Sequence, residues 1–110
     1  MKITLPLPTS INATYRSGNG HYWKSDEARI WEATAMFAYA KQAKQLKPVD
    51  GNVILEIKFF LKRDRDIDSG LKILLDFLQG RFYENDRQVQ ELDVVKFVDK
   101  ENPRVEVRTV

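Results

Sequence analysis

The sequence has no cysteine, and His21 is its single histidine. Without cysteine the chain forms neither disulfide bonds nor thiolate metal sites. One histidine is too few for a His-rich zinc site and argues against a Ser/His or Cys/His catalytic pair. A metal ion bound by this chain would be held mainly by carboxylate oxygens, which favours Mg²⁺ or Mn²⁺.

Long apolar runs are also missing. No stretch of about 18 apolar residues occurs, so we expect no transmembrane helix and no membrane partner. The N-terminal MKITLPLPTS lacks the apolar segment of a signal peptide. Because 43% of the 110 residues are hydrophobic, we expect one core and a single domain over residues 1–110.

Neither sign of charge dominates, since 18 Lys and Arg offset 16 Asp and Glu to a net charge of +2. Basic residues nevertheless gather around the acidic pair Asp66 and Asp68. This distribution suits a polyanionic substrate, which the basic residues would attract while the acids hold a cation at the bond to be cut. An ordinary solvated surface explains the same distribution equally well. The basic residues near the pair are Lys58, Lys62, Arg63, Arg65 and Lys72, and a second series, Lys41, Lys44 and Lys47, is expected on an outer helix face.

The N-terminal half predicts a short strand, a long loop and a long helix. Residues 3–5 form an apolar strand, and residues 9–24 carry the turn signal SGNG within a polar and aromatic loop. Ser25 can cap a helix over about residues 26–46, which Pro48 ends. The core face of this helix is expected to contain Ile30, Ala33, Phe37 and Ala40, broadened by Trp31, Ala35 and Ala38.

The C-terminal half predicts three strands and a second helix. Apolar residues alternate along 53–61, a turn occupies 83–88, and strands follow within 89–98 and over 104–109. The second helix is expected over about residues 69–79, with an apolar stripe of Leu71, Leu74, Leu75 and Leu78. We therefore predict an α/β fold, a single domain with helices packed against one mixed sheet, in the order β-α-β-α-β-β.

The acidic pair lies in the segment RDIDSGLK, residues 65–72. In extended backbone Asp66 and Asp68 would point to the same side, where two carboxylates can share one Mg²⁺ with water and phosphate oxygens. Lys72, one turn into the second helix, would stabilise charge that develops on a phosphate, and Asp86 is the best candidate for a third acid. Together these groups suit phosphodiester hydrolysis.

Simpler explanations of the same residues stay open. Asp68 could merely cap the helix, and Asp76 could merely pair with Lys72 on the helix surface. A second string, PVD at 48–50 followed by EIK at 56–58, resembles the PD-(D/E)xK signature of restriction-type nucleases. Asp50 and Glu56 are closer together in the sequence than is usual for that motif. Asp50 is better explained as part of an Asp-Gly turn.

A more specific pattern extends across the chain. Its core is Asp66-x-Asp68-x3-Lys72-x3-Asp76, followed by Asp86-x2-Val89 and Val95-Lys96. Together with the opening ITLPLPTSINATYR, this pattern resembles the RusA family of Holliday junction resolvases, from Ile3 to about Val107. Two positions depart from the family pattern. Asn85 stands where some relatives have an acid, and Gly70 lies in the expected first helical turn.

The resemblance implies a RusA-like fold and a Mg²⁺-dependent homodimer, with Mn²⁺ as a substitute, that nicks four-way DNA junctions symmetrically. It also implies a bacterial or prophage origin, a cytoplasmic location and no small-molecule substrate. Asp66, Asp68 and Asp86 match the metal-binding acids of the family, and Lys72 matches its catalytic lysine. The alternatives are a branched-DNA-binding accessory protein that does not cut and a nuclease that prefers other branched DNA.

DNA contacts are expected on separate parts of the chain. The resemblance includes Asn12, Tyr15 and Arg16, and Arg16 could meet phosphate directly. The aromatic residues 21–23 could stack on exposed bases, or they could anchor the loop to the core. The remaining expected contacts are Lys62, Arg63, Arg65 and Lys96, the last of them facing the cleft.

Overall fold

The computed structural model describes residues 2–43 and 47–109, except for the side chains of residues 11 and 12. None of the helices in these ranges is long and apolar enough to span a membrane. In chain order the elements are β1 (Lys2–Leu5), α1 (Ile11–Thr14), β2 (Tyr15–Gly18), β3 (His21–Lys24), α2 (Asp26–Gln42), β4 (Val53–Leu61), α3 (Leu71–Leu78), the 3₁₀ helix η1 (Asp86–Gln88), β5 (Val89–Val98) and β6 (Arg104–Thr109).

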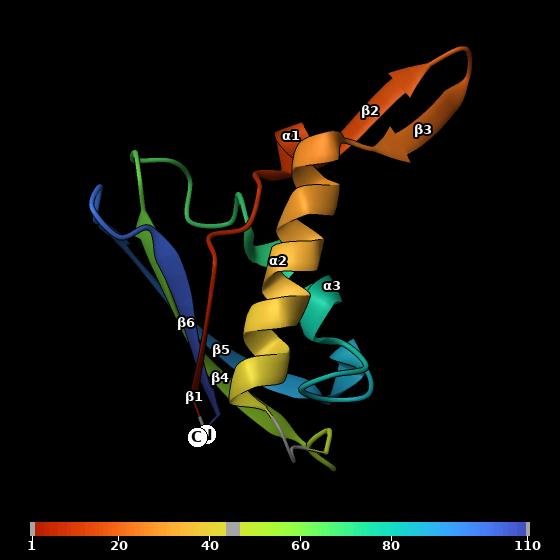
Figure 1. Ribbon diagram of the computed structural model, residues 1–110. Helices are drawn as coiled ribbons and strands as arrows, with labels where there is room; N and C mark the ends of the chain where they lie inside the picture. The colour runs from red at the N-terminus through yellow and green to blue at the C-terminus, as the bar shows by residue number, and fades with distance from the viewer. Residues whose placement is uncertain (1, 44–46, 110) are drawn as a thin grey trace.

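The main sheet has four strands in the order β1-β6-β4-β5. Strands β4 and β5 are parallel, and the other neighbours are antiparallel. Helices α2 and α3 lie on one side of this sheet (Figure 1). The predicted mixed α/β fold is therefore confirmed, and β1, α2, β4, α3, β5 and β6 follow the predicted order β-α-β-α-β-β.

Strand β4 has the bounds that its alternation predicts, and every second side chain is buried. It lies between β6 and β5, so the residues that it turns inward form the centre of the core. Because β4 and β5 are parallel, the chain must cross back over the sheet between them, and α3 makes this crossover. The buried side chains of β4 are Val53, Leu55, Ile57, Phe59 and Leu61.

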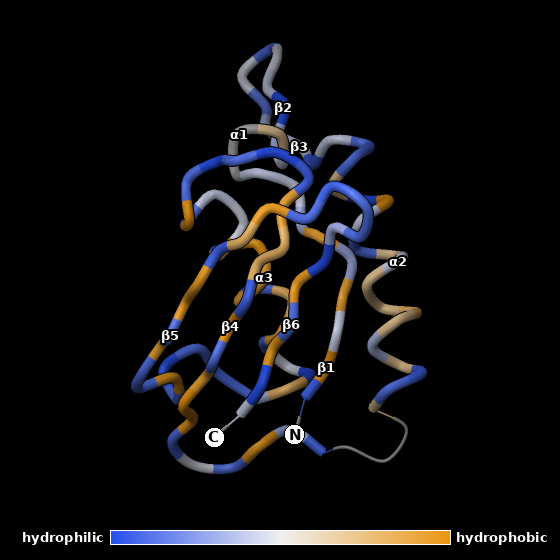
Figure 2. The backbone as a smooth tube through the Cα atoms, turned by 90° about the vertical axis from the view of Figure 1, so that its left-hand side faces the viewer, coloured by the Kyte–Doolittle hydropathy of each residue, from blue (hydrophilic) through white to orange (hydrophobic). Residues whose placement is uncertain are grey.

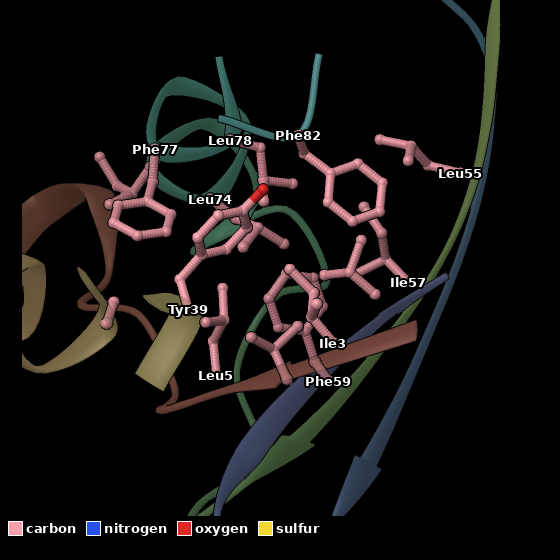
Figure 3. Packing of buried hydrophobic residues seen from close by; sticks show 14 of the residues in the cluster. Ile3, Leu5, Tyr39, Leu55, Ile57, Phe59, Leu74, Phe77, Leu78 and Phe82 are labelled. Atoms are coloured by element: carbon pink, nitrogen blue, oxygen red, sulfur yellow. The ribbon is translucent and has the colours of Figure 1, made fainter. Parts of the chain in front are cut away.

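The core fills the space between the sheet and the two helices (Figure 3). Phe77 of α3 packs edge to face on two rings of α2, with centroids 5.3 Å from Trp31 and 6.2 Å from Tyr39. Such aromatic pairs contribute about 0.5–1.5 kcal/mol beyond their buried area, so they set how α2 lies against α3. Leu74, Leu78, Phe82 and Tyr83 complete this layer and are fully buried.

Helix α2 buries only part of the face that was predicted: Trp31 and Ala35 are buried as expected, whereas the residues predicted at its centre are exposed. Apolar side chains occur on both sides of the helix, so periodicity alone could not choose between them. The Trp31 Nε1 donates to the Pro6 carbonyl at 2.9 Å, which turns its side of the helix inward. The exposed residues are Ile30, Ala33, Phe37 and Ala40, whereas Ala28, Trp31, Ala35 and Tyr39 are buried.

The end of α2 also differs from the prediction. The helix ends at Gln42 rather than near residue 46, since Ala43 is not helical. Of the three lysines predicted on an outer helix face, Lys41 lies there, with its Nζ 4.7 Å from the centre of the Phe37 ring. Lys47 follows the end of the helix, and Lys44 lies outside the described residues.

The predicted loop over residues 9–24 is wrong in most of its length. It contains the short helix α1 and the hairpin β2–β3, in which Tyr15–Gly18 pairs with His21–Lys24. The two residues of its turn, Asn19 and Gly20, have φ angles of 51° and 76°. Two positive φ angles define the type I′ turn that joins twisted strands, and Asn-Gly is the sequence that favours it.

Candidate active site

The connection between β4 and α3 carries the acidic pair. The Ser69 amide donates to the Asp66 carbonyl at 3.1 Å, and the Leu71 amide donates to the Asp68 carbonyl at 3.2 Å. Both acids therefore lie in turns, so the extended backbone that we predicted for them is wrong. Helix α3 begins at Leu71 behind an N-cap glycine, Gly70, rather than at Ser69, so Asp68 does not cap it.

The side chains of Asp66 and Asp68 are exposed. Within the described part of the chain, no hydrogen bond or ion pair engages either carboxylate, and the nearby Lys96 bonds to Asp64 instead. Four oxygen atoms on this connection are thus left for ligands outside the chain.

Two residues predicted to contact DNA hold this connection in place. Arg65 Nη2 donates to the Pro8 carbonyl at 2.9 Å, and burial lowers the pKa of Arg65. Lys96 Nζ donates to Asp64 Oδ1 and to the Arg65 carbonyl, both at 2.9 Å. Arg65 therefore turns part of its guanidinium group toward the protein, and its contact with DNA stays a prediction. Lys96 lies on the inner side of the sheet, but protein oxygens already occupy its ammonium group.

Lys72 lies on the exposed side of α3, one turn before Asp76. Its Nζ lies 3.1 Å from Asp76 Oδ1, which is the ion pair expected from the spacing. The hydrogen bond from Asp76 raises the pKa of Lys72, and the charges of Asp76 and Asp86 act in the same direction. Lys72 and Asp76 therefore form an ion pair, and the charge of Asp86 adds to the effect of Asp76.

Asp86 is held by a tyrosine that the sequence did not single out. The hydroxyl of Tyr83 lies 2.9 Å from Asp86 Oδ1 and 3.0 Å from the Leu75 carbonyl, and its ring is fully buried. Burial raises the pKa of Tyr83, and the hydrogen bond to Asp86 raises it further. The Asp86 amide also donates to Gln79 Oε1 at 3.0 Å. In the sequence, the only sign of this anchoring role was that Tyr83 lies three positions before the candidate acid Asp86.

The four acids around the candidate site, Asp66, Asp68, Asp76 and Asp86, fall into two groups rather than one. Asp66 and Asp68 belong to the β4–α3 connection, whereas Asp76 and Asp86 surround Lys72 and Tyr83. In the described part of the chain, no three His, Asp or Glu side chains lie close enough together to hold one metal ion. The predicted set of Asp66, Asp68 and Asp86 is therefore not assembled within the single chain.

The arrangement combines two exposed carboxylates, a lysine paired with Asp76, and an acid anchored to a buried tyrosine. The family model described as "Endodeoxyribonuclease RusA" matches residues 6–109 of this chain. The chain belongs to the RusA endodeoxyribonuclease family. No curated protein matches it. Both acidic groups, Lys72 and the β2–β3 hairpin lie inside the matched range.

The two departures from the RusA pattern have structural explanations. Asn85 is the N-cap of η1, and its side chain accepts from the Arg87 amide at 2.9 Å. An asparagine therefore shapes the turn that presents Asp86. Gly70 is buried, and a Cβ there would lie 3.3 Å from Arg65 Nη2 and 3.4 Å from Pro8. Glycine leaves room for the packing that holds the β4–α3 connection.

The β2–β3 hairpin extends away from the body of this RusA-family chain (Figure 1). Tyr22 is 81% exposed and Trp23 is 45% exposed, so the alternative in which residues 21–23 anchor a loop to the core is wrong. Tyr15 and Arg16 are exposed on β2, whereas the side chain of Asn12 lies outside the described residues. The exposed aromatic rings remain candidates for base stacking.

The nuclease-like string at 48–50 and 56–58 does not form a site. Glu56 and Lys58 project from the bare face of β4, opposite to the side that carries α3. Glu56 lies 3.8 Å from Arg108 of β6. These charges belong to the outer surface of the sheet, and they lie away from Lys72.

Proposed function

We propose that this chain is a Mg²⁺-dependent, structure-selective endodeoxyribonuclease that resolves four-way DNA junctions by paired symmetric nicks, in recombination and repair. The observation that carries the proposal is the exposed Lys72, paired with Asp76 and one turn beyond the exposed pair Asp66 and Asp68. In a chain of the RusA family, this combination of groups favours phosphodiester hydrolysis of DNA. A bacterial or prophage protein that acts on DNA would work in the cytoplasm.

Asp66 and Asp68 have the chemistry of magnesium ligands. Mg²⁺ is usually bound by one or two protein carboxylates and completes its shell with water and phosphate oxygens. Both carboxylates are exposed, and the described residues leave their oxygens unengaged. When bound, Mg²⁺ or Mn²⁺ would polarise the phosphate and activate a water. Asp86, which the single chain holds apart from this pair, is proposed as the third acid of the same active site.

Lys72 acts as an electrostatic group in this proposal. Lys72 is exposed and paired with Asp76, which raises its pKa, so we assign it the role of a cation rather than of a general base. A fixed ammonium group beside the phosphate stabilises the negative charge that develops during attack. The Asp76 carboxylate positions the ammonium group from one turn further along α3.

A homodimer completes the proposal, because two-fold symmetry presents one active site to each of two strands of like polarity. The exposed Lys62 and Arg63, with Tyr15 and Arg16 on the hairpin, are proposed as contacts to the DNA backbone and bases.

The test is cleavage of a labelled four-way junction with Mg²⁺ and with EDTA. Asp68→Asn should slow cleavage at least about 100-fold, since changes around a bound metal already cost about 10- to 100-fold. Asp50→Asn, at an exposed aspartate in the turn before β4, is the control and should stay within about threefold of the native rate.

Native cleavage by Asp68→Asn would overturn the site. Junction binding without Mg²⁺-dependent products would favour the accessory protein. Faster cutting of three-way or flap substrates would favour a nuclease for other branched DNA.

A further inference from the structure

Strand β5 is a long edge that no other strand of the described chain covers. It lies at the end of the order β1-β6-β4-β5 and has ten residues, whereas about five or six are usual. At about 3.3 Å per residue it spans roughly 33 Å. This is close to the 32 Å intermediate dimension of the whole molecule. Figure 2 shows β5 running along the open side of the sheet.

This edge has some of the devices that keep edge strands apart and lacks others. Natural edges are shortened, bulged, interrupted by proline or protected by charged side chains. Strand β5 carries the charges of Glu91, Asp93 and the inward-facing Lys96, but it is neither short nor interrupted. Strand β5 contains no proline or glycine, and its pairing with β4 shifts only near Val89. Apolar side chains are exposed on both of its faces, Leu92 (42%) and Val98 (51%) on the helix side, and Val95 (39%) and Phe97 (45%) on the bare side.

We propose that β5 pairs antiparallel with β5 of a second copy, so that the two sheets form one continuous eight-stranded sheet. This inference deepens the homodimer of the proposed function by locating its interface. An edge strand is self-complementary, because a two-fold axis through its centre brings the same unpaired amides and carbonyls face to face. Apolar side chains on both faces would be buried together with the backbone groups.

The charges of β5 select the register. A two-fold axis at Asp93 or at Lys96 places like charges directly opposite each other, which is destabilising. An axis at Leu92 places Glu91 opposite Asp93. With the axis at Val94 no like charges are opposed, and the strands overlap from Gln90 to Val98. An axis at Val95 is compatible as well, but it overlaps only Leu92 to Val98. We therefore place the axis at Val94.

The outer face of α2 is the competing surface for a second copy. Ile30 is 66% exposed and Phe37 is 67% exposed there. The backbone groups inside a helix are already paired, however, and Lys41 covers part of the Phe37 ring at 4.7 Å. The edge strand combines exposed apolar side chains with an unpaired backbone, so the observations favour β5.

Two substitutions at one position test the register. With the axis at Val94, Val95 lies opposite Asp93 of the second copy. Val95→Glu should weaken dimerisation at least about 10-fold, and Val95→Lys should preserve it. Within its own chain, position 95 pairs with Lys58 on the same face. The glutamate is therefore expected to suit the monomer better than the lysine does, so loss of the dimer by the glutamate alone would point to the interface.

The measurement is sedimentation equilibrium without DNA or metal, with thermal unfolding to verify the fold. The double variant Asp93→Lys/Val95→Glu, which exchanges the opposed charges, should restore the dimer. A native chain that is monomeric at about 100 µM would overturn the proposal, as would dissociation by Phe37→Glu but not by Val95→Glu. Because oligomeric state is measured without cleavage, its failure leaves the nuclease assignment to be judged by the junction assay alone.

Discussion

The two acidic groups of the candidate site are held in opposite ways. Asp66 and Asp68 lie in exposed turns, and no described side chain engages them. Asp86 is tied through the hydroxyl of Tyr83, whose ring is part of the core, and through its amide to Gln79. One group is placed by the backbone alone, and the other is placed by the packing of the domain.

The two arrangements suit two different tasks, which are binding a cation and holding an acid in a fixed orientation. A carboxylate with free oxygens can take a cation as soon as one arrives, because no protein hydrogen bond must be broken first. An acid that is hydrogen-bonded to a buried group keeps its orientation, and such support is what fixes groups in a reacting geometry. Lys72 belongs with the second kind, since Asp76 restrains its ammonium group.

Lys72→Met is expected to have the largest effect within the anchored group. It removes the cation and keeps the side chain at a similar length, so single-turnover cleavage should fall by about 10²- to 10³-fold. Thermal stability should hardly change, because Lys72 is exposed. The exposed Lys62 on the β4–α3 connection supplies the control, and Lys62→Met should mainly weaken junction binding. Equal cleavage losses from the two variants would remove the special role of Lys72.

Tyr83→Phe should have an intermediate effect and separates anchoring from catalysis. Loss of the hydroxyl leaves the Asp86 carboxylate without its buried donor, so we expect cleavage to fall about 10-fold and stability to fall by about 1–2 kcal/mol. Denaturant unfolding and cleavage kinetics measure these two quantities.

Tyr39→Phe is the matched control for Tyr83→Phe. The Tyr39 hydroxyl is buried and has no hydrogen-bond partner within the described residues. Its removal should leave cleavage unchanged and should not destabilise the chain. If both variants lowered cleavage alike, the anchoring of Asp86 would not be the cause.

Asp76→Asn should have the smallest effect and should appear mainly in the titration of Lys72. The native pair raises the pKa of Lys72, so the cation is fully present below the ordinary lysine pKa and is lost only as pH rises through the elevated value. Without the Asp76 charge, the pKa of Lys72 falls back toward its ordinary value, which NMR titration of the lysine side chains in the DNA-free and metal-free chain measures. An unmoved Lys72 titration in the variant would contradict this role for Asp76.

The sequence was most informative where one interaction dominates. The alternation of β4 predicts its bounds and its buried face, because a strand with one apolar side has one way to face a core. It was least informative for α2, because apolar residues occur on all sides of that helix. It was also uninformative for the β2–β3 hairpin, because the Asn-Gly pair was interpreted as part of a loop rather than as a hairpin turn. The role of Tyr83 could not be predicted, since its contact with Asp86 exists only once α3 and the following turn are packed.

By itself, the sequence determined the α/β class, the order of its main elements, the spacing of Asp66, Asp68, Lys72 and Asp86, and the resemblance to RusA that the family match bears out. These features are local, because periodicity and spacing follow from backbone geometry. Only the tertiary structure decided which side of α2 is buried, that the acids form two separate groups, and that β5 is left as an open edge. Those outcomes depend on contacts between segments far apart in the chain, which local pattern does not encode.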